Sequence, residues 1–198
     1  MSLTTCEMRW LFDGPLPGAV ERWLQSGGDT TAPTSREDRY LTLPGVVDMG
    51  IKQREGRVDI KGRLAVLGFH AIAPEIEGVA ERWCKWTYDA AIADRLGCFQ
   101  GDVIVVGKSR VQRYFLLDSD GRTQRTVQRD PTQRGFSLEL TRIRLAGGEH
   151  WSLGVEAAPD DPDLLANLLH ALGEVLRGFP VTLPRERSMS YPAWLARL

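Results

Sequence analysis

Two short stretches on either side of Glu55-Gly56 place cationic side chains at every second position. The cations are Lys52, Arg54, Lys61 and Arg63. Because charged and apolar residues alternate here, the pattern predicts a β-hairpin with one charged and one apolar face. Like charges that face each other directly destabilise a sheet, so two adjacent cationic rows indicate a task such as binding an anion. The alternative that stays open is an ordinary solvated face of an antiparallel sheet.

Other predicted strands also carry charged residues at every second position, opposite an apolar face. Residues 6–12 and residues 103–117 both read as strands in which one face is apolar. The charged positions are Glu7 and Arg9 in the first of these strands and Lys108 and Arg110 in the second. The second of these strands would therefore carry a third row of cations.

Carboxylates accompany these cations near the end of the chain. Residues 136–145 and 149–157 predict a second hairpin through Gly147-Gly148, with Glu139 and Glu156 on its two strands. Carboxylate oxygens are the ligands that Mg²⁺ and Mn²⁺ prefer, and such an ion can bridge phosphate oxygens. A metal site beside the cationic rows is therefore a further expectation.

The remaining sequence predicts helices and loops around these strands. A short helix is expected at residues 17–25, a loop at residues 26–38, and a mixed segment at residues 68–80. Further helices are expected at residues 90–96, from the acidic start at Asp160, and at residues 190–195. Together these elements predict an α+β fold. We expect the strands to curl into a closed antiparallel β-barrel with helices packed outside.

Composition limits the classes of protein that the chain could represent. The chain has 198 residues, which favours one domain over residues 1–198, and 42% of them are hydrophobic. The formal net charge of -1 argues against nucleic-acid and membrane partners, although it does not exclude a basic interior. The N-terminal residues lack a secretory pattern, so a cytoplasmic location is expected. The three cysteines have no C-x-x-C spacing, and neither a disulfide framework nor a zinc site is indicated.

A barrel would turn the apolar strand faces outward against the helices and the charged faces inward. Lys and Arg side chains in a partly desolvated lumen bind phosphate strongly, because charge-assisted hydrogen bonds gain strength as the local dielectric constant falls. The sequence thus favours a site for a polyphosphate anion. An apolar-ligand carrier of lipocalin type fits the charged inward parity poorly.

Over most of its length the sequence resembles the CYTH, or triphosphate tunnel, superfamily of adenylate cyclase and thiamine triphosphatase type. The matching features are Glu7-Met8-Arg9, the Lys52-to-Arg63 hairpin, Lys108-Ser109-Arg110, Glu139 before Thr141, Glu156, and the terminal Ser190-Tyr191. The resemblance implies an eight-stranded tunnel that binds triphosphate. It implies phosphate contacts for Arg9, Lys52, Arg54, Lys61, Arg63, Lys108 and Arg110. It implies Mg or Mn at Glu7, Glu139 and Glu156, with Glu139 and Glu156 in catalysis.

The first strand departs from the family signature Glu-x-Glu-x-Lys, because this chain has Glu7-Met8-Arg9-Trp10-Leu11. One carboxylate and the lysine of the signature are replaced. Two functions therefore remain open for this chain. One is a metal-dependent phosphohydrolase acting on inorganic triphosphate or a triphosphorylated small molecule, and the other is a non-catalytic binder of polyphosphate or another anion.

Overall fold

The structure is a computed structural model that describes residues 2–28, 30–95, 97, 99, 102–128, 130 and 132–197. The strands are β1 (Ser2–Asp13), β2 (Thr34–Leu41), β3 (Met49–Arg54), β4 (Arg57–Ala73), β5 (Ile76–Asp89), β6 (Val103–Leu117), β7 (Thr123–Thr126), β8 (Gly135–Leu145) and β9 (Gly148–Ala158). The helices are α1 (Gly18–Ser26), α2 (Ala90–Arg95), α3 (Leu164–Val175) and α4 (Tyr191–Leu195), with a 3₁₀ turn at Arg185–Arg187. In the described part of the chain, no helix is both long and apolar enough to cross a membrane.

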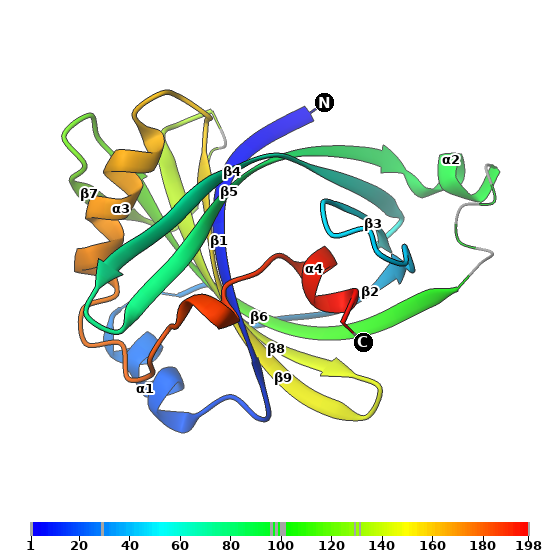
Figure 1. The fold of residues 1–198 in the computed structure, drawn as a ribbon, viewed down its shortest axis with the longest axis horizontal. Coiled ribbons are helices and arrows are strands. Elements are labelled where there is room, and N and C mark those ends of the chain that lie inside the picture. Colours follow the sequence, from blue (N-terminus) through cyan, green and yellow to red (C-terminus); the bar gives the residue numbers. More distant parts are fainter. Residues whose placement is uncertain are drawn as a thin grey trace.

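Eight of the strands close into a barrel (Figure 1). The strand order is β2-β3-β4-β5-β1-β9-β8-β6, and a pairing of β2 with β6 completes the ring, from Thr34 opposite Arg110 to Leu41 opposite Val103. The pairings between these strands are antiparallel, and β7 extends the sheet beyond β6. The predicted closed antiparallel barrel of about eight strands is therefore confirmed.

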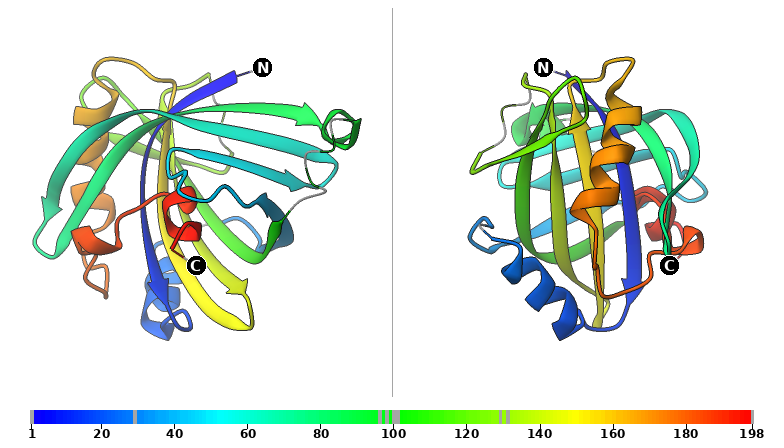
Figure 2. Two further views of the ribbon diagram at one scale, coloured as in Figure 1. Left: turned by 45° about the vertical axis from the view of Figure 1, so that its right-hand side comes forward. Right: turned by 90° about the vertical axis from the view of Figure 1, so that its left-hand side faces the viewer.

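The apolar core lies outside the barrel rather than in its lumen. On β1 the side chains of Met8 and Trp10 are buried against the helices, whereas the alternate residues Glu7 and Arg9 line the interior. Figure 2 shows α3 lying across the outer face of the sheet, and its buried Leu168 and Leu172 belong to the same core. Burial of this face against α1 and α3 forces the charged parity of the strands inward.

The central strands are longer than the sequence pattern indicates. Residues 68–80, expected to be mixed, belong to β4 and β5, which pair as one long hairpin that turns at Glu75. Three irregularities in the β4–β5 register, the first between Arg63 and Ala65, shift the alternation of side chains. Because these irregularities interrupt the two-residue period, residues 68–80 do not show the regular alternation that predicts a strand.

The predicted loop at residues 26–38 is wrong in its last part, because β2 begins at Thr34. Residues 34–38 contain no apolar residue and so lack the alternation that marks a half-buried strand. They become a strand because β6 pairs with them along their whole length.

The C-terminal helix α4 takes a different place from the other helices. The expectation that helices pack outside holds for α1 and α3, whereas α4 lies across the opening of the ring (Figure 1). Ser190 caps α4 by accepting a hydrogen bond from the Ala193 backbone NH at 3.4 Å. Trp194 anchors the helix in a second buried cluster with Leu11 and Tyr40. The helix is thereby fixed at the barrel interior.

Candidate anion-binding tunnel

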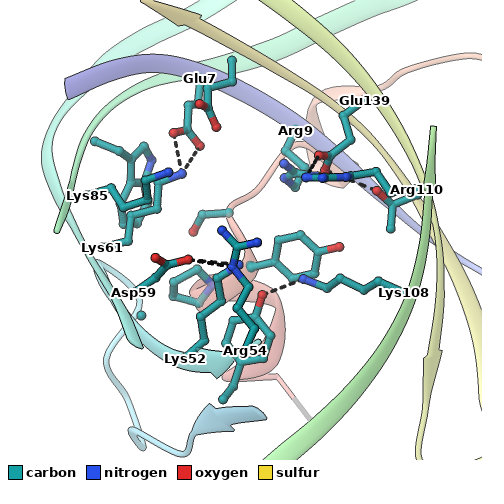
Figure 3. A pocket seen from close by; sticks show the side chains of 18 of the residues that line it. Glu7, Arg9, Lys52, Arg54, Asp59, Lys61, Lys85, Lys108, Arg110 and Glu139 are labelled. Carbon is teal, nitrogen blue, oxygen red and sulfur yellow. Dashed lines mark hydrogen bonds and ion pairs between the residues drawn. The ribbon is translucent and has the colours of Figure 1, made fainter. Parts of the chain in front are cut away.

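A cavity of about 160 Å³ occupies the barrel interior and is lined mainly by charged side chains (Figure 3). Among the described residues its cationic lining is Arg9, Arg36, Lys52, Arg54, Lys61, Lys85, Lys108 and Arg110. Its acidic lining is Glu7, Asp59, Glu81, Glu139 and Glu156. The cations come from six different strands, β1 to β6, and outnumber the carboxylates. The lumen therefore carries an excess of positive charge although the whole chain does not.

The structure brings six of the seven residues predicted to bind phosphate to this cavity. The seventh, Arg63, is not part of the lining; its Nη1 lies 2.7 Å from Oε1 of Glu81, and its guanidinium lies over the Trp83 ring. The position of these cations in the cavity agrees with the alternation of charged and apolar residues along β3, β4 and β6. Phosphate binding by these residues stays a prediction.

Asp38 holds three of the cations on one wall of the tunnel. Its carboxylate is fully buried, and Nζ of Lys108 and Nζ of Lys52 both donate to the same oxygen, Oδ2, at 2.9 Å and 3.2 Å. Nε of Arg36 donates to Oδ1 at 2.9 Å. Burial opposes ionisation of Asp38, but Lys108, Lys52 and Arg36 together hold its pKa well below the usual range.

The two lysines that share Asp38 are poorly solvated and close to other cations. Burial, followed by the charge of Lys108, lowers the pKa of Lys52 to about 7. Burial likewise lowers the pKa of Lys108 to about 8, against the opposing effect of Asp38. The Lys108 ammonium also donates to the Tyr40 hydroxyl at 2.6 Å and lies 3.8 Å from the centre of the Tyr191 ring. Both pKa values lie close to neutral pH, so the charge of this wall changes with pH in that range.

Arg9, Glu139 and Arg110 form a second charged group on the β1–β9–β8–β6 side. Nη1 of Arg9 and Nη1 of Arg110 each lie 3.3 Å from one oxygen of Glu139. Burial opposes ionisation of Glu139, but the two arginines lower its pKa to about 2. The Nε atom of Arg110 is buried and has no hydrogen-bond partner among the described residues. One donor in this group is therefore left unsatisfied.

Gly154 on β9 makes the approach of Arg9 possible. It lies between Arg9 on β1 and Glu139 on β8 in the register of the three strands. A Cβ atom at this position would lie 2.7 Å from the guanidinium of Arg9. A larger residue would displace the guanidinium of Arg9 from this position, so the glycine leaves room for the ion pair of Arg9 with Glu139.

The predicted metal ligands are divided between two parts of the wall. Glu7 and Glu156 are register partners on β1 and β9, and Glu81 follows opposite Glu7 on β5. Nζ of Lys61 donates to Glu7 at 2.6 Å. Burial opposes protonation of Lys61, but Glu7 and Glu156 raise its pKa. Among the described residues no group of three or more His, Cys, Asp or Glu side chains is arranged to hold a metal ion. The set of Glu7, Glu139 and Glu156 thus stays a prediction.

Sequence reasoning missed several members of the lining and the buried Asp38 behind them. Arg36 and Asp38 are separated by two positions, the same spacing that identified the central hairpin, but they fell in the predicted loop. Glu81 and Lys85 share the parity of Trp83 on β5 and could have been found by extending the charged face to that strand. Asp59, an acidic residue between the cations of the hairpin, accepts hydrogen bonds from Arg54 Nε at 2.9 Å and from the Thr87 hydroxyl at 2.7 Å.

The fold and the lining define a closed antiparallel β-barrel with a charged, mainly basic lumen. No protein-family model and no curated protein sequence matches the chain. Solved structures do resemble it. The protein PH1819 from Pyrococcus horikoshii OT3 is similar with a TM-score of 0.50 and 14% identity, over 96% of this chain and 98% of that chain.

Two further solved structures are similar. They are the protein PH1012 from Pyrococcus horikoshii OT3 (TM-score 0.47, 16% identity, 92% of this chain and 93% of that chain) and a conserved hypothetical protein from Pyrococcus furiosus (TM-score 0.48, 11% identity, 95% of this chain and 98% of that chain). At such low identity the similarity to PH1819 concerns the fold alone.

Proposed function

We propose that the barrel binds a polyphosphate anion, either inorganic triphosphate or the triphosphate group of a small molecule, in its lumen. The observation that carries the proposal is the convergence of cations from six strands on one enclosed cavity (Figure 3). Such a cavity suits a chain of linked phosphates, because each phosphate can accept charge-assisted hydrogen bonds from a different wall.

The internal carboxylates are consistent with this role. Asp38, Asp59 and Glu139 hold the cations in place before a ligand arrives, which reduces the conformational entropy lost on binding. The excess of cations over carboxylates leaves positive charge for an anion. The enclosed position of this charge favours a small ligand over a nucleic acid or a membrane surface.

The resemblance of the sequence to the triphosphate tunnel superfamily supports the same proposal. The resemblance implies an eight-stranded tunnel, and the barrel of this chain agrees with that expectation. We therefore infer that the chain is a divergent member of the superfamily.

Calorimetric titration with sodium tripolyphosphate tests the proposal. Arg54→Ala and Arg110→Ala should each weaken binding by about 1.5–3 kcal/mol, the range for hydrogen bonds to charged groups. Arg82→Ala is the matched control, because Arg82 forms a similar ion pair with Asp160 on the outer face of the barrel. Equal affinities for the wild type and both lumen variants would place the anion elsewhere.

Metal-dependent hydrolysis of the bound triphosphate is the second candidate function. The observation that favours it is the row of Glu81, Glu7 and Glu156 on adjacent strands at the cavity wall. A Mg²⁺ or Mn²⁺ ion at Glu7 and Glu156 would polarise a phosphoryl group and position the attacking water.

Phosphate release from tripolyphosphate, measured with Mg²⁺, with Mn²⁺ and with a chelator, tests this second function. Release should require the metal, and Glu156→Gln or Glu139→Gln should remove most of it while anion affinity stays equal or increases, because one negative charge leaves the basic lumen. Binding without any release under either metal would leave anion binding as the function.

A further inference from the structure

A second cavity adjoins the charged tunnel at the end where α4 lies. It has a volume of about 220 Å³ and shares Tyr40, Gly50 and Pro192 with the lining of the tunnel. These three residues lie between the two cavities, and we call them the neck. A Cβ atom on Gly50 would lie 3.0 Å from Cγ of Pro192, so Gly50 and Pro192 pack closely together at the neck.

The lining of this second cavity is apolar, in contrast to the tunnel. Beyond the neck its larger side chains are those of Leu41, Leu43, Val46, Met49, Ile104 and Leu195. They come from the end of β2, the connection to β3, the start of β3, the start of β6 and the end of α4. Beyond the neck no side chain of the lining is charged, and only that of Thr42 is polar. We call this cavity the apolar mouth.

The apolar mouth opens to the surface through hydrophobic residues. Met49, the first residue of β3, is 39% exposed, and Val47 in the connection before it is also 39% exposed. Apolar surface that lines a groove is a common feature of ligand-binding sites. The position of this surface at the end of a cationic tunnel indicates a ligand that extends from one cavity into the other.

From this juxtaposition we propose that the ligand is an amphiphile: a phosphorylated molecule whose phosphates occupy the tunnel and whose apolar, prenyl-like or alkyl chain occupies the apolar mouth. The inference rests on the proposed function of the tunnel and adds the class of organic group attached to the phosphates. Neither cavity alone reaches the roughly 300–1,000 Å³ that is typical of small-molecule sites, but the volumes of the two adjoining cavities together do.

The chemistry of the apolar mouth selects against polar organic groups. A nucleoside brings hydroxyl, amine and carbonyl groups that need hydrogen-bond partners when they leave water. The side chains of the mouth offer only the Thr42 hydroxyl. A hydrocarbon chain needs no such partner, and each buried methylene strengthens binding about fourfold.

Titration calorimetry with geranyl diphosphate and inorganic diphosphate tests the inference, with tripolyphosphate as the reference ligand for the tunnel. Geranyl diphosphate should bind the wild type at least tenfold more tightly than inorganic diphosphate. The double variant Val46→Asn/Met49→Gln should lose most of this preference and keep the wild-type affinity for tripolyphosphate, because neither substitution changes the charge.

Leu64→Gln/Val66→Asn is the matched control, since Leu64 and Val66 are both 57% exposed on β4 and do not line either cavity. This control should keep the full preference. Equal binding of geranyl diphosphate and inorganic diphosphate, with tripolyphosphate still bound, would overturn the inference and leave the proposed function intact. Failure of all three ligands to bind would overturn both.

Discussion

Replacing Asp38 with Asn is expected to lower the free energy of unfolding by about 3–5 kcal/mol, the cost of removing one partner from a buried ion pair. Asp38 is fully buried and is the carboxylate to which Lys52, Lys108 and Arg36 all donate. The amide keeps the size of the side chain but removes the charge that offsets three cations. Urea denaturation in a phosphate-free buffer measures the loss.

Asp160→Asn is the control for this substitution, because Asp160 pairs with Arg82 on the surface and a surface ion pair contributes only about 0–1 kcal/mol. Added tripolyphosphate should restore part of the stability of the Asp38 variant, since a ligand that binds only the folded state stabilises it by mass action. An Asp38→Asn protein as stable as the wild type would show that the cations do not depend on this carboxylate.

Affinity for tripolyphosphate is expected to fall as pH rises above 7, and the decrease should be steeper for the wild type than for Lys52→Arg. The pKa of Lys52 is lowered to about 7 by burial and by Lys108. The lysine is therefore charged below this pH, and above it the bound anion must draw a proton onto it. Arginine stays charged throughout this range.

The charged groups around Lys52 are Asp38 and Arg36 on β2, Arg54 on β3, Asp59 on β4 and Lys108 on β6. All of them remain in Lys52→Arg, so the difference between the two profiles isolates Lys52. Between pH 7 and pH 9 the wild type should lose up to roughly fiftyfold more affinity than the variant. Parallel profiles, measured by calorimetry at constant ionic strength, would show that Lys52 does not titrate on binding.

Much of the barrel could be predicted from local sequence because its two faces differ so clearly. On β1, the alternation of Met8 and Trp10 with Glu7 and Arg9 separates the outer core from the lumen. The same alternation on β3 and β6 placed Lys52 and Lys108 in the interior. After Arg63, irregular pairing interrupts the alternation on β4, and the sequence no longer predicts a strand there.

The ion pairs of the lumen could not be predicted in the same way. Asp38 and Lys108 are 70 residues apart, and Arg9 and Glu139 are 130 residues apart. Their contacts arise only when β2 closes the ring on β6 and when β1 pairs with β9. Parity shows which face a side chain occupies, but the register between distant strands decides its partner.

A crystal structure of the protein with bound tripolyphosphate tests the central claim most directly. The account predicts that the phosphate chain lies in the lumen, with oxygen atoms within hydrogen-bonding distance of Lys52 on one wall and Arg110 on the other. Tripolyphosphate bound only to the outer face, for example at Arg142 and Arg144, with an unchanged lumen, would contradict the account.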